Sequence, residues 1–378
     1  MTSKPIFWLR HETKPGERRT PLTPVGAKKL KQNGADVFIE SSPTRIFKDE
    51  EYKGCSIVPT NSWKSAPREA FILGIKELQE DSFPLEHNHI YFAHAYKGQA
   101  GAKELLTRFR SGQGTLLDLE YLVDSSGRRV AAFGYWAGFV GAVLGLAAFY
   151  EQKRNTFLGR VEPFESKSAL LNFARNCRAK YQEKVKALVI GAKGRCGRGA
   201  CEALAELETS VTEWDIEETK KGGPFAELLE HDLVVNCVLL NQSIAPFIDE
   251  QLASKERTLS TIADVSCDAT NPHNPIRLYQ SITTMDSPVH ILDLGGRRLD
   301  ILAIDHLPSL LPRESSEDFA DQLLSHLITL CDAKASGAQQ LPKVWDPAQR
   351  LFEQKLVELN IITHSIPRPI EPIQEANL

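Results

Sequence analysis

The sequence has no large excess of either charge. Its 378 residues include 45 Lys or Arg and 49 Asp or Glu, which gives a formal net charge of −4 at pH 7. This balance offers no electrostatic reason to expect binding to nucleic acid or to an anionic membrane surface. Hydrophobic residues make up 42% and charged residues 25%, as in soluble globular proteins, and the length predicts two domains or three.

The sequence also lacks a Cys-x-x-Cys pair, and its seven cysteines are odd in number. This pattern argues against a disulfide framework and against a zinc site, so we expect reduced thiols and no metal. No internal repeat, low-complexity block or secretory signal is visible, because MTSKPIFWLR leads directly into a strand pattern. These absences favour a cytoplasmic protein.

One long run contains no charge at all, Val130–Tyr150, VAAFGYWAGFVGAVLGLAAFY. It is long enough to span a bilayer, and its glycines have a spacing that suits close helix packing. A membrane helix is therefore one interpretation. The run is rich in Gly and Ala rather than Leu and Ile, and soluble α/β patterns lie on both sides. We therefore favour a buried helix that crosses between two domains.

The segment Lys184–Thr219 has the order strand, glycine turn, helix, strand and acid. Its landmarks are the strand pattern Ala187–Ile190, then Gly191, Gly194 and Gly197, the strand pattern Ser210–Trp214, and Asp215. Glycines in this position let backbone N–H groups approach a pyrophosphate at the N-terminus of a helix. A carboxylate at Asp215 accepts from ribose hydroxyls and repels a 2′-phosphate, so the pattern predicts NAD rather than NADP. A purely structural glycine turn is the alternative.

Short apolar runs alternate with helical or loop patterns elsewhere. They lie at Ile6–Arg10, Val37–Glu40, Ala70–Ile75, Ile90–Ala93, Thr115–Leu117, Leu233–Cys237, Thr261–Val265 and His290–Leu294. Alternation of this kind predicts parallel sheets with helices on both faces, and hence an α/β protein with two doubly wound domains. Thr23 and Pro24 predict the start of a helix that Gly34 ends, and we expect a loop at Gly295–Arg298.

Ionisable residues follow four strand patterns of the first half. They are Glu17, Arg18 and Arg19, then Lys76 and Glu77, then His94, Lys97 and Gln99, and finally Glu120, Arg128 and Arg129. The carboxyl ends of parallel strands line the ligand crevice of such folds, so these side chains would form a cationic pocket. That pocket suits a substrate with several carboxylates, with a Lys/His pair for proton transfer. Beside a nicotinamide it fits oxidation of a C–N or C–O bond. For any one of these residues a solvated loop charge is the better interpretation, and it is their shared placement at strand ends that favours a pocket.

Several stretches resemble the fungal saccharopine dehydrogenases of the NAD-dependent, lysine-forming type, within the alanine dehydrogenase and transhydrogenase superfamily. They are ETKPGERRTPLTP, ILGIKEL, YFAHAYKGQAG, GTLLDLEYL, GRRVAAFGYWAGFVGA, GAKGRCGRGA, WDIEETKKGGPF, DATNPHNP and IDHLPSLLPRES. The resemblance implies two Rossmann-like domains, residues 1–133 with 313–378 and residues 134–312, and an active site in the cleft between them. It also implies cleavage of saccharopine with NAD⁺ and water to lysine and 2-oxoglutarate, the last step of the α-aminoadipate route to lysine. We expect a monomer.

The same resemblance implies roles for individual residues. Lys76 is the acid/base that acts on the secondary amine, and His94 handles the protons of water addition and imine breakdown. The positions for the substrate are Arg19, Lys76, Glu77, Lys97, Gln99, Glu120 and Arg129, of which Glu77 and Glu120 tune the catalytic pair. The positions for NAD are Arg128, Phe133, Gly191, Gly194, Arg195, Gly197, Asp215, Thr219, Val265, Ile304, Asp305, His306 and Leu307.

Two other functions stay open. An amino acid oxidoreductase similar to alanine dehydrogenase shares the Arg, Lys and His elements, whereas the extra cations Lys97, Arg128 and Arg129 favour a tricarboxylate. A non-catalytic NAD(H)-binding sensor is the second, and the Lys76/His94 pair speaks against it. The last residues, Ala376-Asn377-Leu378, are only loosely similar to the peroxisomal Ser-Lys-Leu signal, which leaves peroxisomal import weakly supported.

Overall fold

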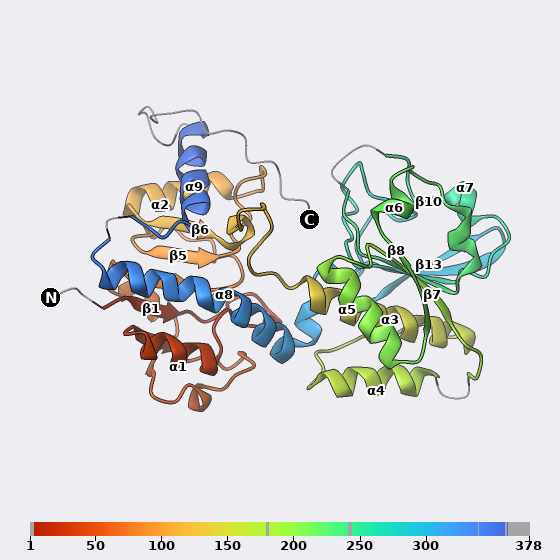
Figure 1. The fold of residues 1–378 in the computed structure, drawn as a ribbon, viewed down its shortest axis with the longest axis horizontal. Helices are drawn as coiled ribbons and strands as arrows, with labels where there is room; N and C mark the ends of the chain where they lie inside the picture. The colour runs from red at the N-terminus through yellow and green to blue at the C-terminus, as the bar shows by residue number, and fades with distance from the viewer. Residues whose placement is uncertain (1–3, 179–180, 241–243, 339, 360, 362–378) are drawn as a thin grey trace. The chain divides into compact units, whose positions relative to one another are not determined.

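The computed structural model of the chain describes residues 4–178, 181–240, 244–338, 340–359 and 361. Their contacts divide them into two compact units, the described parts of 1–132 and 316–377 in the first and those of 133–315 in the second. Figure 1 shows helices beside the strands of each unit. Each unit is therefore an α/β structure, as the alternating pattern predicts.

The first unit is built on a six-stranded parallel sheet in the order β3-β2-β1-β4-β5-β6. Its strands are β1 (Ile6–Leu9), β2 (Asp36–Glu40), β3 (Ser56–Val58), β4 (Phe71–Leu73), β5 (Asn88–Tyr91) and β6 (Thr115–Asp118). The apolar runs predict all of these except β3, an edge strand whose Ser56 and Ile57 are exposed. The order places β1 beside β4, where the winding of the chain reverses, and ligands of doubly wound sheets bind at such switch points.

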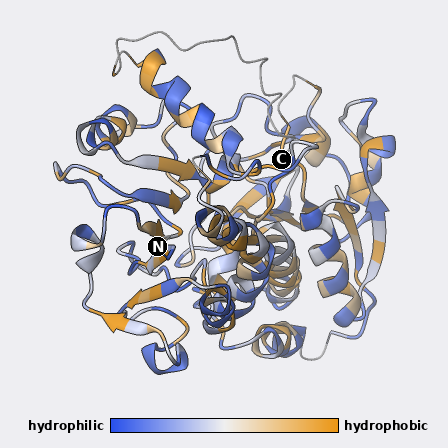
Figure 2. Ribbon diagram, turned by 60° about the vertical axis from the view of Figure 1, so that its left-hand side comes forward, coloured by the Kyte–Doolittle hydropathy of each residue, from blue (hydrophilic) through white to orange (hydrophobic). Residues whose placement is uncertain are grey.

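The helices of this unit have clear sequence signals. They are α1 (Pro24–Gln32), α2 (Ala102–Gly112), α9 (Asp346–Glu358) and residues 316–335 of α8 (Pro312–Ala335), with the 3-10 helices η1 (Asp49–Glu51), η2 (Ser62–Ser65) and η3 (Leu119–Tyr121). The start of α1 is confirmed, since the Thr23 hydroxyl accepts the N–H of Gly26 at 3.1 Å. Buried residues recur every fourth position along α9, and Figure 2 shows the matching alternation of hydrophobic and hydrophilic residues on this helix.

The second unit has a six-stranded sheet in the order β13-β14-β11-β9-β7-β8, parallel except for β13. Its strands are β7 (Lys186–Ile190), β8 (Ser210–Trp214), β9 (Leu233–Asn236), β11 (Thr261–Asp264), β13 (Val289–Leu294) and β14 (Arg297–Leu302), and β10 (Ile248–Asp249) pairs with β12 (Ile276–Arg277). The expected loop at Gly295–Arg298 is wrong in part. Gly295 and Gly296, both with positive φ, form a tight hairpin turn, and residues 297 and 298 already belong to β14.

The uncharged run forms the central helix of this unit, α3 (Gly134–Lys153), in which residues 138–150 are buried. The prediction of a buried helix is confirmed, but the helix does not cross between two domains, because all of α3 belongs to the second unit. No helix among the described residues has the length and apolar character needed to cross a membrane. The glycines let α3 meet α5 (Arg195–Glu206) backbone to backbone, because a Cβ at Gly138 would lie 1.8 Å from the Cys196 carbonyl oxygen. The remaining helices are α4 (Lys167–Arg178), α6 (Ile216–Thr219), α7 (Glu250–Ala253), η4 (Ala226–Glu230) and η5 (Leu307–Leu310).

Candidate active site

The ionisable residues of the first unit gather at one edge of its sheet. Strands β1, β4, β5 and β6 are parallel neighbours, so their carboxyl ends open on the same side. The loop with Glu17 and Arg19 follows β1, Lys76 and Glu77 follow β4, His94 follows β5, and Glu120 lies in η3 directly after β6. The fold therefore brings together the strand-end residues that the sequence predicts as a group.

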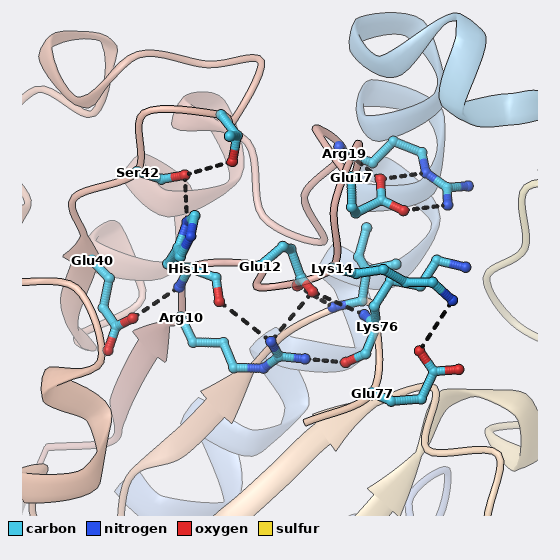
Figure 3. A network of polar contacts seen from close by, with 12 residues as sticks. Arg10, His11, Glu12, Lys14, Glu17, Arg19, Glu40, Ser42, Lys76 and Glu77 are labelled. Atoms are coloured by element: carbon cyan, nitrogen blue, oxygen red, sulfur yellow. Dashed lines mark hydrogen bonds and ion pairs between the residues drawn. The ribbon is translucent and has the colours of Figure 1, made fainter. Parts of the chain in front are cut away.

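Lys76 lies next to a buried ion pair. Arg19 donates to Glu17 through Nε at 2.8 Å and through Nη2 at 2.7 Å, and both side chains are almost fully buried. Burial lowers the pKa of Lys76, the positive charge of Arg19 lowers it further, and Glu17 acts in the opposite direction. A lysine of this kind holds its proton less firmly than one in water, which suits it to exchange a proton with a bound amine. Figure 3 shows Lys76 close to this pair.

His94 and Glu77 form a charged pair in the same cluster. His94 Nδ1 lies 2.6 Å from Glu77 Oε1, and Lys14 Nζ lies 3.6 Å from Glu77 Oε2. The hydrogen bond to His94 lowers the pKa of Glu77 to about 2, and the same bond raises the pKa of His94. His94 also has a positive φ of 49°, a conformation that non-glycine residues rarely adopt and that is found at functional sites.

Lys97, Gln99 and Glu120 complete the cluster. Lys97 Nζ donates to Glu120 Oε1 at 3.0 Å, and its backbone N–H donates to Gln99 Oε1 at 2.8 Å. Sequence reasoning missed Asp118, which accepts the N–H of Glu120 at 2.9 Å and the N–H of Ala93 at 3.3 Å. Burial raises the pKa of Asp118 to about 7. Its position as the last residue of β6 was the available signal.

Arg128 and Arg129 lie in the turn that follows η3. Val123 and Arg129 form an isolated antiparallel bridge, and Arg128 closes the turn by donating its N–H to Asp124 at 3.1 Å. Arg128 Nε donates to the Ser126 hydroxyl at 3.1 Å, and the side chain is exposed. The side chain of Arg128 is therefore exposed to solvent, whereas the backbone of Arg129 is fixed by its bridge to Val123.

The glycine segment of the second unit forms the expected turn between β7 and α5. Gly191 has a φ of +81°, and a Cβ at Gly197 would lie 2.1 Å from the Gly191 carbonyl oxygen, so strand and helix approach closely. Gly194 is the N-cap of α5 and contributes no side-chain cap, while Arg195 is the first helical residue. The first N–H groups of the helix therefore remain available to an anion. This geometry fits the pyrophosphate of a dinucleotide.

Asp215 directly follows β8 and is the N-cap of α6. Its carboxylate accepts the N–H of Lys193 and the N–H of Ile216, each at 2.9 Å, and it also accepts from the backbone of Glu218 in a capping box. With about four acceptor sites on a carboxylate, these bonds leave capacity for a further donor. Thr219, the buried last residue of α6, donates its hydroxyl to the Asp215 carbonyl at 2.9 Å. The acid is therefore fixed where a ribose hydroxyl can donate to it.

The other predicted nucleotide residues follow neighbouring strands of the same sheet. Val265 follows β11 and residues 304–307 follow β14, so they lie at the same carboxyl edge of the sheet as the glycine turn. Phe133 is the N-cap of α3. Ile304 and Leu307 are buried, and Asp305 hydrogen-bonds His306.

A buried network at this edge was not predicted. Asp264 accepts from the Tyr279 hydroxyl at 2.7 Å and from the Asn236 amide at 2.9 Å, and burial raises its pKa to about 6.

Comparison with known proteins identifies the relatives of this chain. The family model for the N-terminal domain of alanine dehydrogenase/PNT matches residues 8–140. The chain is 47% identical to the saccharopine dehydrogenase [NAD(+), L-lysine-forming] of Candida glabrata over 92% of this chain and 95% of that one. It is 45% identical to the protein of the same name from Yarrowia lipolytica, over 95% of this chain and 100% of that one.

Solved structures show the same fold at low sequence identity. An L-alanine dehydrogenase superposes with a TM-score of 0.62 at 17% identity, covering 94% of this chain and 99% of that one. A transhydrogenase from Sinorhizobium meliloti gives a TM-score of 0.60 at 15% identity, covering 90% of this chain and 97% of that one.

Proposed function

This chain belongs to the saccharopine dehydrogenase family of the NAD(+)-dependent, L-lysine-forming type, and on that premise we propose that it cleaves saccharopine. The reaction takes saccharopine, NAD⁺ and water to lysine, 2-oxoglutarate, NADH and a proton, as the last step of the α-aminoadipate route. One observation carries the assignment of this chemistry to the first unit. Lys76 and His94 share a cluster in which the pKa of the lysine is lowered and that of the histidine is raised.

Lys76 takes the proton of the secondary amine as the C–H bond of the glutaryl α-carbon breaks. NAD⁺, when bound, supplies the acceptor for the hydride that leaves that carbon. His94 then guides the protons of water addition to the resulting imine, and it returns a proton to the lysine nitrogen as the C–N bond breaks. Glu77 holds His94 in place through its 2.6 Å hydrogen bond and favours the charged imidazolium.

The substrate carboxylates require cations that the cluster supplies. We assign Arg19, Lys97 and Arg129 to these groups, with Gln99 and Glu120 as hydrogen-bonding neighbours. Lys97 Nζ donates to Glu120 at 3.0 Å, so the carboxylate of Glu120 balances the positive charge of Lys97 while no substrate is bound. Three carboxylates need several cations, and a substrate as small as alanine would leave most of them without a partner.

We assign nucleotide binding to the second unit. The N–H groups at the start of α5 would hold the pyrophosphate, and Asp215 would accept from the ribose hydroxyls and repel a 2′-phosphate. Arg195, Thr219, Val265, residues 304–307 and Phe133 belong to the same proposal, and the family resemblance adds Arg128 of the first unit. We further propose that the protein is a cytoplasmic monomer. The peroxisomal alternative rests on Ala376–Leu378, which lie outside the described residues.

The test is the formation of NADH by the purified protein with NAD⁺ and saccharopine, followed in parallel with alanine. We expect NADH with saccharopine, together with equimolar lysine and 2-oxoglutarate. Activity with alanine alone would overturn the proposal in favour of an alanine-dehydrogenase-like enzyme. Binding of NADH without turnover of either substrate would instead favour the sensor.

A further inference from the structure

A buried ion pair from the β1 loop encloses the backbone of Lys76. Arg10 and Glu12 are only 2% and 8% exposed, and Arg10 Nη1 lies 3.3 Å from Glu12 Oε2. Glu12 Oε1 accepts the N–H of Ile75 at 2.6 Å, and Oε2 accepts the N–H of Lys76 at 3.0 Å. Arg10 Nη2 donates to the carbonyl oxygen of Lys76. Figure 3 shows Arg10 and Glu12 bonded to each other and to Lys76.

These bonds replace the strand-to-strand hydrogen bonds at the point where the sheet ends. Gly74 N–H still donates to the Ile90 carbonyl at 3.0 Å, and the Ile75 carbonyl still accepts from Phe92 at 3.1 Å. Beyond that point, the N–H of Ile75 and both backbone polar groups of Lys76 are bound by Glu12 and Arg10. Buried backbone groups need partners, and here side chains of the neighbouring loop supply them instead of a strand.

The space for this arrangement depends on Gly74. A Cβ at Gly74 would lie 2.3 Å from Arg10 Nε and 2.5 Å from its Cζ. On another side, the Arg10 guanidinium lies 5.5 Å from the centre of the Tyr91 ring. Sequence alone does not reveal the pair, because it depends on β1 and β4 lying side by side.

We propose that Arg10 and Glu12 are positioning residues that fix the backbone of Lys76, and so the direction of its amine, for proton transfer. The inference rests on the role of Lys76 in the proposed function. Lys76 lies beyond Phe71–Leu73, the three residues of β4, so the strand pairs of the sheet do not include its backbone. A misplacement of about 1 Å at a reacting group can cost about 100-fold in rate.

A purely structural role makes a different prediction. Removing one partner of a buried pair leaves an unpaired charge and destabilises the fold, whereas removing both charges restores much of the stability. If the pair only stabilises the fold, the double variant Arg10→Met/Glu12→Gln recovers both the melting temperature and kcat. If the pair positions Lys76, the double variant recovers the melting temperature while kcat stays low.

The experiment compares Glu12→Gln, the double variant and Gly74→Ala with the wild type. For all three we expect kcat with saccharopine to fall about 10- to 100-fold, with an altered pH profile of kcat and an unchanged Kd for NADH. Gly74→Ala leaves both charged groups in place and only displaces the guanidinium, so it decides the question if the other variants do not fold. Wild-type kcat and pH profile in Gly74→Ala, or recovery of kcat in the double variant, would overturn the proposal.

The matched control is Asp300→Asn in the second unit. Asp300 is fully buried and accepts two bonds from Arg298 at 2.7 Å each, so its loss should lower the melting temperature without changing the pH profile.

A readout without turnover separates this proposal from the proposed function. The pKa of the Lys76 amine can be measured from the pH dependence of its chemical labelling, located by mass spectrometry. A wild type that does not turn over saccharopine defeats the proposed function, whereas an unchanged labelling profile in Glu12→Gln and Gly74→Ala defeats the positioning role.

Discussion

The two units share a sheet architecture but prepare the edge of the sheet differently. In the second unit, α5 starts directly after the glycine turn, and Gly194 adds no side-chain cap, so the helix N-terminus is open. In the first unit, residues 10–23 separate β1 from α1, and the Thr23 hydroxyl occupies the N–H of Gly26. The same edge thus offers backbone donors for an anion in one unit and charged side chains in the other. We therefore expect the connection between the first strand and its helix to determine which kind of ligand each sheet binds.

Loss of the first unit's chemistry should leave the second unit's binding intact. In Lys76→Met we expect kcat with saccharopine to fall about 10²- to 10⁴-fold, the usual contribution of a general acid/base. The Kd for NADH, measured by fluorescence titration, should stay within about twofold. Lys64→Met is the control, because Lys64 pairs with Asp81 away from the cluster. Full turnover in Lys76→Met would remove this lysine from the mechanism.

A side chain added inside the glycine turn should weaken nucleotide binding by the second unit. In Gly197→Ala the new methyl would lie 2.1 Å from the Gly191 carbonyl oxygen, so α5 must move away from β7. Overpacking of this kind costs about 1–3 kcal/mol, and we expect NADH affinity to fall about tenfold or more. Gly159→Ala is the control, since a Cβ there meets nothing within 4 Å. Equal NADH affinity in the two variants would contradict a nucleotide site at this turn.

Nucleotide choice should depend on the acid after β8. In Asp215→Ser the hydroxyl can still accept a backbone N–H, but the negative charge is lost. We expect KM for NAD⁺ to rise about tenfold, as for the loss of a charged hydrogen bond of roughly 1.5 kcal/mol, and activity with NADP⁺ to appear. The ratio of kcat/KM for the two nucleotides is the measurement. An unchanged ratio of kcat/KM would show that Asp215 does not discriminate between the riboses of NAD⁺ and NADP⁺.

The smallest effect should come from the His94–Glu77 pair. The raised pKa of His94 contributes stability that is present below its ordinary value of 6.5 and is lost as pH rises through the raised pKa. The lowered pKa of Glu77 contributes stability present above 4.5 and lost as pH falls towards about 2. The difference in melting temperature between wild type and Glu77→Gln should therefore be largest between pH 4.5 and 6.5. A difference that is flat across pH would argue against the pair.

Local pattern predicts much of this molecule. The glycine turn, Asp215 and the strand-end cluster all lie where short apolar runs and their flanking residues indicate, because side chains after parallel strands share an edge. The roles of Arg10 and Glu12 are not predictable in this way, since Glu12 binds a residue 64 positions further on. Asp264 lies inside the strand pattern Thr261–Val265, and Asp118 directly follows the pattern Thr115–Leu117. In the same way, the pattern predicts a loop where β14 begins, because the hairpin turn at Gly295 and Gly296 is shorter than the run of polar residues suggests.

The backbone contact between α3 and α5 limits which substitutions these two helices can accept. Most buried positions of α3 can exchange one hydrocarbon for another of similar volume, since neighbouring side chains adjust. Gly138 and Gly199 have no such freedom, because a methyl at either would meet a carbonyl oxygen of the opposite helix at about 2 Å. Any accepted change there must tilt α5 and so redirect the amides at its start. A single Gly→Ala substitution between these two helices could therefore abolish coenzyme binding during evolution.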